Sequence, residues 1–291
     1  MLGVFDSGFG GLTVLRAIHD RLPDVSTVYL GDNARAPYGT RSHEEVFAFA
    51  LEGVRELFRR GCPLVIFACN TASAQALRQI QRTILPVEFP DRRVLGVIRP
   101  TAEEIVSMSA TKHIGVFATP ATVLSGAYVR EISSQFLISN FQFPRPVITQ
   151  VACPGRLTIL IEAGEDKSPE AESIVASCCQ ELLAADPLVD TVLLGCTHYP
   201  LVKPLFDKYL RNNDIPLPTL SVGSKVDRRV VSQGTIVADK LVDYLARHSD
   251  VDDRIDRAGS RQYLTTKSDD GLSSLASRFY GKTVHFETVT L

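Results

Sequence analysis

The sequence predicts an α/β protein with two pseudo-symmetric, doubly wound domains, each built on a mostly parallel sheet. Three observations support this fold class. The chain has 291 residues, which exceeds the commonest size of a single hydrophobic core. Short runs rich in Val, Ile and Leu alternate with segments of helical period along almost the whole chain. Two of these strand-and-turn units are echoed later in the sequence, in the same order.

The strands are predicted from apolar runs that are short, rich in branched residues and bounded by polar segments. An N-terminal strand ends at Asp6. Further strands are expected at residues 25–31, 63–69, 94–98, 113–118, 147–152 and 191–196. Runs of this kind indicate strands that are buried on both faces, as in a parallel sheet between two layers of helices.

The helices are predicted from apolar residues at helical spacing and from capping signals. The clearest segment begins after Ser42, which forms a capping box with Glu45, and ends at Gly61. Ser168 and Pro169 provide a cap and a first-turn proline for another helix. Two more, at residues 71–82 and 200–210, follow predicted strands. This alternation is typical of βαβ units.

The internal echo places two cysteines at equivalent points. The sequence GVFDS at residues 3–7 is echoed by GVFAT at 115–119, and VIFACNT at 65–71 by VLLGCTH at 192–198. Two lobes related by a pseudo-twofold axis would place Cys69 and Cys196 on opposite sides of a cleft, which is the predicted active site. We expect residues 1–98 and 208–291 to form the first lobe, and residues 99–207 the second.

The composition excludes several classes of protein. Charged residues make up 22% and the net charge is -2, which gives no reason to expect a nucleic-acid or membrane surface. The N-terminus enters a strand pattern without a signal-peptide layout, so we expect a cytoplasmic protein. Six cysteines without a Cys-x-x-Cys pair indicate neither a disulfide framework nor a zinc ribbon. We predict no metal and no cofactor.

The paired cysteines point to proton transfer at a carbon stereocentre. Inversion of such a centre needs one base on each face of the carbon, and two pseudo-symmetric thiols meet that requirement. Each cysteine ends a predicted strand and precedes a helix, whose free N–H groups stabilise a thiolate and bind a carboxylate. A lone cysteine at such a position is usually a packing residue. The matched contexts of Cys69 and Cys196 favour a functional pair.

Other polar segments leave the carboxyl ends of strands. Asp6 and Ser7 open a glycine-rich turn, which is a weak nucleotide signal but suits a small anion and an ammonium group. Pro37, Tyr38 and Gly39 are expected to form a rigid wall that exposes backbone N–H groups. His198 lies two residues beyond Cys196 and is a candidate to assist proton transfer.

Taken together, these stretches resemble glutamate racemases of the cofactor-independent aspartate/glutamate racemase superfamily. The resemblance covers essentially the whole chain. It rests on the motifs FDSGFGGL at 5–12, PYG at 37–39, ACNTA at 68–72, ATPAT at 118–122 and GCTHYP at 195–200, with YLTT at 263–266 as a closing strand. The pair of cysteine motifs with the DSGxGG opening is highly specific.

The resemblance implies an enzyme that interconverts L- and D-glutamate and supplies D-glutamate for peptidoglycan. We also expect a homodimer. It implies that Cys69 takes the α-proton of D-glutamate with help from Asp6, and that Cys196 takes that of L-glutamate with help from His198. The α-amino and α-carboxylate groups would be held by Ser7, Asn70, Thr71 and Thr197. The side-chain carboxylate would be held by Tyr38, Gly39, Thr119 and Thr122.

One assisting residue and several alternatives stay open. Glu162 matches a family glutamate near the site, but it follows Cys153 and Pro154 with one residue more than the family pattern. An aspartate racemase is the nearest rival. A two-lobed amino-acid binding protein gives no reason for paired thiols, and metal hydrolysis through Cys196 and His198 lacks a third ligand.

Overall fold

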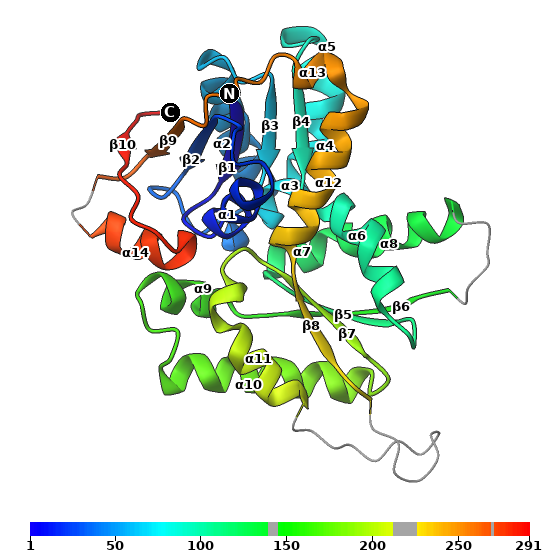
Figure 1. Ribbon diagram of the computed structural model, residues 1–291. Helices are drawn as coiled ribbons and strands as arrows, with labels where there is room; N and C mark the ends of the chain where they lie inside the picture. The colour runs from blue at the N-terminus through cyan, green and yellow to red at the C-terminus, as the bar shows by residue number, and fades with distance from the viewer. Residues whose placement is uncertain (139–144, 212–225, 269–270) are drawn as a thin grey trace.

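The computed structural model describes residues 1–138, 145–211, 226–268 and 271–291, which form two parallel β-sheets with helices around them (Figure 1). The six-stranded sheet has the order β10-β9-β2-β1-β3-β4 and the four-stranded sheet the order β6-β5-β7-β8. The strands of the first are β1 (Leu2–Asp6), β2 (Thr27–Gly31), β3 (Leu64–Phe67), β4 (Arg93–Gly96), β9 (Arg261–Thr265) and β10 (Glu287–Thr288). Those of the second are β5 (His113–Ala118), β6 (Val147–Ala152), β7 (Thr191–Gly195) and β8 (Arg229–Ser232).

The predicted fold class is confirmed, and the two sheets share one topology. Four consecutive strands of the first sheet run β2-β1-β3-β4, and the four strands of the second run β6-β5-β7-β8. The central strands β1 and β5 therefore occupy equivalent places, as do β3 and β7. In register, Phe5 of β1 lies opposite Phe67 of β3, and Phe117 of β5 opposite Leu194 of β7. This equivalence is the physical basis of the echo in the sequence.

Helices cover both faces of each sheet. Around the first are α1 (Leu12–Arg21), α2 (His43–Arg59), α3 (Asn70–Gln75), α4 (Leu77–Gln79), the π-turn η2 (Ile80–Ile84), α5 (Leu85–Glu88), α12 (Gln233–Arg247), α13 (Ser249–Asp252) and α14 (Leu272–Tyr280), with the 3₁₀ turn η1 (Tyr38–Thr40). Around the second are α6 (Ile98–Met108), α7 (Pro120–Ser125), α8 (Ala127–Ile138), α9 (Gly155–Glu162), α10 (Pro169–Ala185) and α11 (Lys203–Arg211), with the 3₁₀ turn η3 (Tyr199–Val202).

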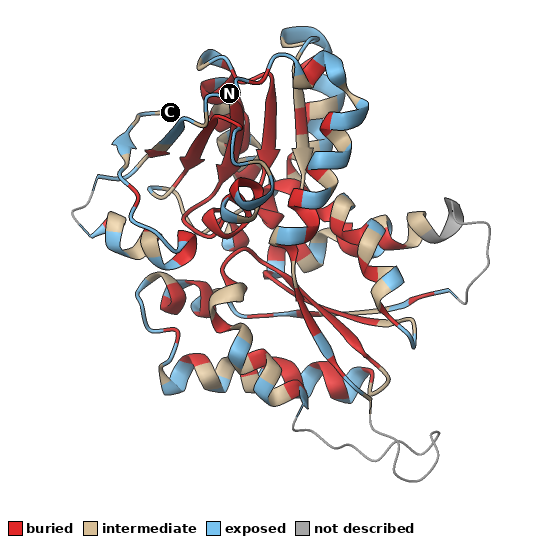
Figure 2. Cartoon of the chain, viewed as in Figure 1, coloured by how far each residue is buried: buried red, intermediate tan, exposed pale blue. Residues whose placement is uncertain are grey.

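The core follows the alternation of side chains along β1. Leu2 and Val4 pack into the cluster that includes α1 and α12, whereas Phe5 packs into the cluster beneath α2. Every residue of β1, β2 and β3 is buried (Figure 2). Strands buried on both faces hold the turns at their carboxyl ends rigidly, and those turns carry the site.

Several elements differ from the prediction. The strand 147–152 is an edge strand with only one buried residue, Val151, because β6 pairs with β5 alone. The helix after Cys69 begins at Asn70 and continues in short pieces to Glu88. After Cys196 the chain first forms the 3₁₀ turn η3, and α11 starts only at Lys203. The capping box of α2 is confirmed in full.

The chain crosses between the sheets twice, after β4 and after β8. The predicted return near residue 208 falls inside α11, and the next strand, β8, still pairs with β7 of the second sheet. The sequence alone does not indicate this pairing, because β8 is a run of only four residues. We propose that the first lobe comprises residues 1–97 and 233–291 and that the second comprises residues 98–232. Among the described residues, no helix has both the length and the apolar character needed to cross a bilayer.

Candidate active site

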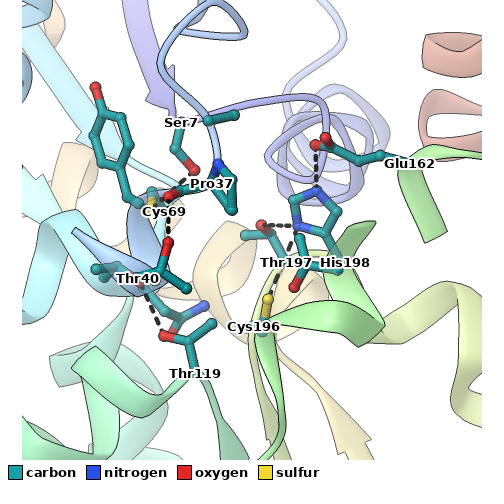
Figure 3. A pocket seen from close by; sticks show the side chains of 16 residues that line it. Ser7, Pro37, Thr40, Cys69, Thr119, Glu162, Cys196, Thr197 and His198 are labelled. Carbon is teal, nitrogen blue, oxygen red and sulfur yellow. Dashed lines mark hydrogen bonds and ion pairs between the residues drawn. The ribbon is translucent and has the colours of Figure 1, made fainter. Parts of the chain in front are cut away.

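A small cavity lies where the carboxyl ends of both sheets meet, and it brings the two cysteines together (Figure 3). It measures about 20 Å³, enough for about one water molecule. Its walls include twelve of the residues predicted from the sequence: Ser7, Pro37, Tyr38, Gly39, Cys69, Asn70, Thr71, Thr119, Glu162, Cys196, Thr197 and His198. Asp6 and Thr122 lie behind this wall.

Four wall residues were not predicted: Ala36, Thr40, Gly155 and Thr158. Ala36 and Thr40 flank the predicted Pro37-Tyr38-Gly39 wall in the chain. Thr158 stands four residues before Glu162 on α9, so both lie on one face of that helix. That spacing was the available signal for Thr158, whereas nothing local to Gly155 indicates a place in the cavity.

Cys69 lies in the turn between β3 and α3, where it caps the helix. The backbone N–H of Ala72 donates to its sulfur at 3.5 Å, and the thiol donates to the Ser7 hydroxyl at 3.5 Å. Burial, with the nearby Asp6 carboxylate as a further cause, raises the pKa of the Cys69 thiol to about 12, although both hydrogen bonds act in the opposite direction. The thiol is therefore protonated at neutral pH, which suits it to donate a proton.

Cys196 lies in the equivalent turn after β7 and is paired with a histidine. Its sulfur is 3.9 Å from Nδ1 of His198, whose Nε2 lies 2.8 Å from Oε1 of Glu162. Burial opposes protonation of His198, but the contacts with Cys196 and Glu162 outweigh it and hold the histidine pKa well above its usual range. Protonated His198 therefore places a positive charge beside the Cys196 sulfur. Cys69 and Cys196 thus occupy equivalent turns with different electrostatics.

Asp6 is fully buried at the end of β1 and connects to both sides of the site. Its carboxylate accepts hydrogen bonds from the Gly8 N–H at 3.0 Å and from the Thr197 hydroxyl at 3.4 Å. Burial raises the pKa of Asp6, although the charge of His198 opposes the shift. A carboxyl group with a raised pKa is suited to exchange protons with a thiol.

The glycine-rich turn at residues 8–11 allows the first lobe to approach the Cys196 turn closely. A methyl group added at Gly10 would lie 2.3 Å from the Thr197 hydroxyl oxygen and 2.6 Å from Nδ1 of His198. Across the cavity, a methyl group added at Gly39 would lie 2.8 Å from Cβ of Thr119. Glycine is required at both places by space, not by backbone conformation.

The Tyr38 side chain is held within the first lobe. Its hydroxyl donates to Oδ2 of Asp32 at 2.5 Å, and the side chain is 1% exposed. The phenol is therefore engaged within the first lobe by Asp32, a residue that the sequence did not single out as a partner. Tyr38 contributes to the cavity wall through η1, as the predicted Pro37-Tyr38-Gly39 wall requires.

Three threonine hydroxyls meet between the lobes. Thr71 is the second residue of α3, Thr119 follows β5 as the N-cap of α7, and Thr122 lies on α7. Their oxygens are separated by 3.1 Å for Thr71 and Thr119, 3.3 Å for Thr71 and Thr122, and 3.0 Å for Thr119 and Thr122. Hydroxyl groups rotate freely, so this cluster can turn its O–H donors toward an anion in the cavity.

The ion pair of Glu162 and His198 makes a prediction for stability. The pKa of His198 is raised in the folded protein. The stabilisation that His198 contributes is therefore fully present below pH 6.5 and is lost as the pH rises through its folded-state pKa. Burial raises the pKa of Glu162, but the contact with His198 outweighs burial, so the pKa of Glu162 is lowered. The stabilisation that Glu162 contributes is therefore present above pH 4.5 and is lost as the pH falls through its folded-state pKa. We expect Glu162→Gln to lower the free energy of unfolding by about 2 kcal/mol near pH 6, the size of one hydrogen bond between charged groups.

Urea unfolding of the Glu162→Gln variant from about pH 4 to about pH 10 measures this loss. The difference from the unsubstituted protein should shrink toward both ends of the range. Glu165→Gln, on an exposed residue of the following turn, is the matched control and should change little. A constant deficit across the whole range would show that the ion pair does not carry the effect.

The fold and the site together define a class: two-lobed α/β proteins with a pair of thiols facing one cavity between the lobes. The family model described as Asp/Glu/Hydantoin racemase matches residues 12–220. A curated glutamate racemase from Paracoccus denitrificans is 39% identical over 297 residues, covering 99% of each chain. The chain belongs to the Asp/Glu/Hydantoin racemase family.

Solved structures agree with this assignment. The glutamate racemase isoform from Bacillus anthracis superposes with a TM-score of 0.81 and 29% identity, covering 100% of this chain and 97% of that one. The glutamate racemase from Francisella tularensis, solved in complex with D-glutamate, gives a TM-score of 0.78 and 27% identity, covering 99% and 97% of the two chains. The similarity therefore extends over both lobes.

Proposed function

We propose that this protein is a glutamate racemase that interconverts L- and D-glutamate with two thiol bases and no cofactor. The observation that carries the proposal is the common cavity of Cys69 and Cys196, each in the turn after equivalent central strands. Full-length relatives named glutamate racemase support the choice of substrate. The D-glutamate formed would supply peptidoglycan synthesis in the cytoplasm.

The proposed reaction moves the α-proton across the cavity. Cys69, with its proton passed to Asp6, takes the α-proton of D-glutamate while Cys196 donates one to the opposite face. In the reverse direction Cys196, assisted by His198, takes the α-proton of L-glutamate and Cys69 donates. The Cys69 thiol is protonated at neutral pH, which suits the donor role in that direction.

The polar walls suit a zwitterionic amino acid with a second carboxylate. Ser7, Asn70 and Thr197 lie beside the thiols and are proposed to hold the α-amino and α-carboxylate groups, together with Thr71. The threonine hydroxyls and the backbone of Pro37-Tyr38-Gly39 are proposed to hold the side-chain carboxylate. Because the cavity holds about one water molecule, the lobes must separate to admit glutamate. A homodimer remains part of the proposal.

The test is conversion of pure enantiomers. Purified protein is incubated with L-glutamate or D-glutamate, and both enantiomers are quantified by chiral chromatography until equilibrium. The proposal expects an equal mixture from either side, with no conversion of L- or D-aspartate under the same conditions. Conversion of aspartate but not glutamate would show that aspartate is the substrate. No conversion of either amino acid would overturn the proposed reaction.

A further inference from the structure

Tyr128 of α8 contacts both turns that carry the proposed thiol bases. Its side chain is fully buried, and its hydroxyl donates to Oδ1 of Asn70 at 2.6 Å, next to Cys69. Its ring packs against Gly195, next to Cys196: a methyl group added at Gly195 would lie 3.0 Å from Cε2 of the ring. One rigid side chain therefore spans the space between the two turns.

Gln233 closes a ring of hydrogen bonds with these side chains. Its Nε2 donates to the Tyr128 hydroxyl at 2.6 Å, and its Oε1 accepts from Nδ2 of Asn70 at 2.7 Å. All three side chains are buried. The Tyr128 hydroxyl thus both donates and accepts within a closed ring, where each bond polarises the next. Such a ring fixes the Asn70 amide more firmly than an isolated hydrogen bond would.

The ring also connects to both crossings between the lobes. Gln233 is the first residue of α12, just after β8, and its Nε2 also donates to the Thr101 hydroxyl at 3.1 Å. Thr101 lies in α6, after the crossing from β4, and its hydroxyl donates to the Val97 carbonyl at 2.7 Å. The two connecting segments therefore meet at the same buried group of polar side chains that holds the residue beside Cys69.

We propose that Tyr128 is a positioning residue that sets the Cys69 turn relative to the Cys196 turn, with Gln233 as its support. This inference rests on the proposed function, because it assigns the tyrosine a part in aligning the two bases. The two ends of the side chain act differently: the hydroxyl holds the Cys69 side and the ring holds the Cys196 side. Removal of the hydroxyl alone should therefore disturb one proton transfer more than the other.

The experiment compares Tyr128→Phe with the unsubstituted protein. L- and D-glutamate have equal free energies in water, so kcat/KM must remain equal in the two directions for any variant. The kinetic isotope effect of α-deuterium on kcat/KM can differ between the two directions. It therefore reports each proton abstraction separately. We expect kcat to fall about tenfold, the loss of one buried hydrogen bond. The effect of α-deuterium should grow for D-glutamate, whose proton goes to Cys69, and shrink for L-glutamate.

A loss of folded protein lowers the rate but leaves both isotope effects unchanged, so this readout separates positioning from stability. Tyr244→Phe removes a hydroxyl from a half-buried tyrosine near the other end of α12 and should leave rate and isotope effects unchanged. Active Tyr128→Phe with unchanged isotope effects would overturn the inference.

A second measurement does not depend on turnover. Iodoacetamide labelling followed by peptide mass spectrometry gives the alkylation rate of each thiol in the ligand-free protein. Tyr128→Phe should speed the labelling of Cys69 several-fold, because its turn opens more often, and should leave Cys196 unchanged. If the unsubstituted protein fails to convert glutamate, the proposed function fails, and the labelling pattern alone decides the role of Tyr128: equal changes at both thiols, or none, contradict it.

Discussion

Substitution of either cavity cysteine by serine should reduce racemisation of glutamate at least about 1,000-fold in both directions. A serine hydroxyl is nearly the size of a thiol, but it gives up its proton far less readily, so it cannot act as the base at neutral pH. Both directions need both groups, one to take a proton and one to give it. Cys69→Ser and Cys196→Ser should therefore be equally inactive, measured by chiral chromatography at saturating glutamate.

Cys62→Ser is the matched control for these substitutions. Cys62 is also fully buried, but it lies in the core beneath α2 and outside the cavity. We expect this variant to lose stability and to keep its rate per folded molecule. Strong activity in either cavity variant, or an equal loss in Cys62→Ser, would contradict the assignment of the two thiols.

Gly10→Ala should reduce the rate about 100-fold, because a displacement of about 1 Å at a catalytic site has an effect of that size. The added methyl group would lie 2.3 Å from the Thr197 hydroxyl oxygen and 2.6 Å from Nδ1 of His198. Neither atom belongs to a long flexible side chain that can move aside at low cost. The glycine-rich turn or the Cys196 turn must therefore shift, and His198 loses its alignment with the sulfur.

The control for Gly10→Ala is Gly61→Ala, which separates strain from misalignment. Gly61 ends the helix α2 region at φ +86° with no atom within 4 Å of an added methyl group. Alanine there costs about 1 kcal/mol of backbone strain and should leave kcat unchanged. Thermal melting and initial rates on both variants distinguish the cases. Full activity in Gly10→Ala would show that the close approach of the two turns is not needed.

The fold class and the pair of cysteines could be predicted from the sequence because both depend on local sequence patterns. The echo of residues 65–71 at 192–198 predicted equivalent turns, and β3 and β7 do occupy equivalent places in the two sheets. Six apolar runs marked strands correctly because each is flanked by polar segments. The capping box of Ser42 and Glu45 likewise depends on residues three apart, and it forms as predicted.

The features that the sequence missed depend on contacts between distant residues. The sequence of the short strand β8 has no distinctive strand pattern, and its assignment depends on its pairing with β7. The hydrogen-bonded side chains of Gln233 and Tyr128, for example, lie 105 positions apart in the sequence. Local sequence motifs identify residues that face the cavity. The side chains that support them depend on contacts formed only when the whole lobe is folded.

The central claim is that two thiols act from opposite faces of the α-carbon, and deuterium labelling tests it most directly. L-glutamate is incubated with the protein in deuterium oxide. After a few per cent conversion, the two enantiomers are separated and their α-deuterium content is measured by mass spectrometry. A two-base reaction predicts that the D-glutamate formed carries deuterium at the α-position while the remaining L-glutamate keeps its proton. Equal labelling of both enantiomers, or retention of the original proton in D-glutamate, would show that a single base serves both faces.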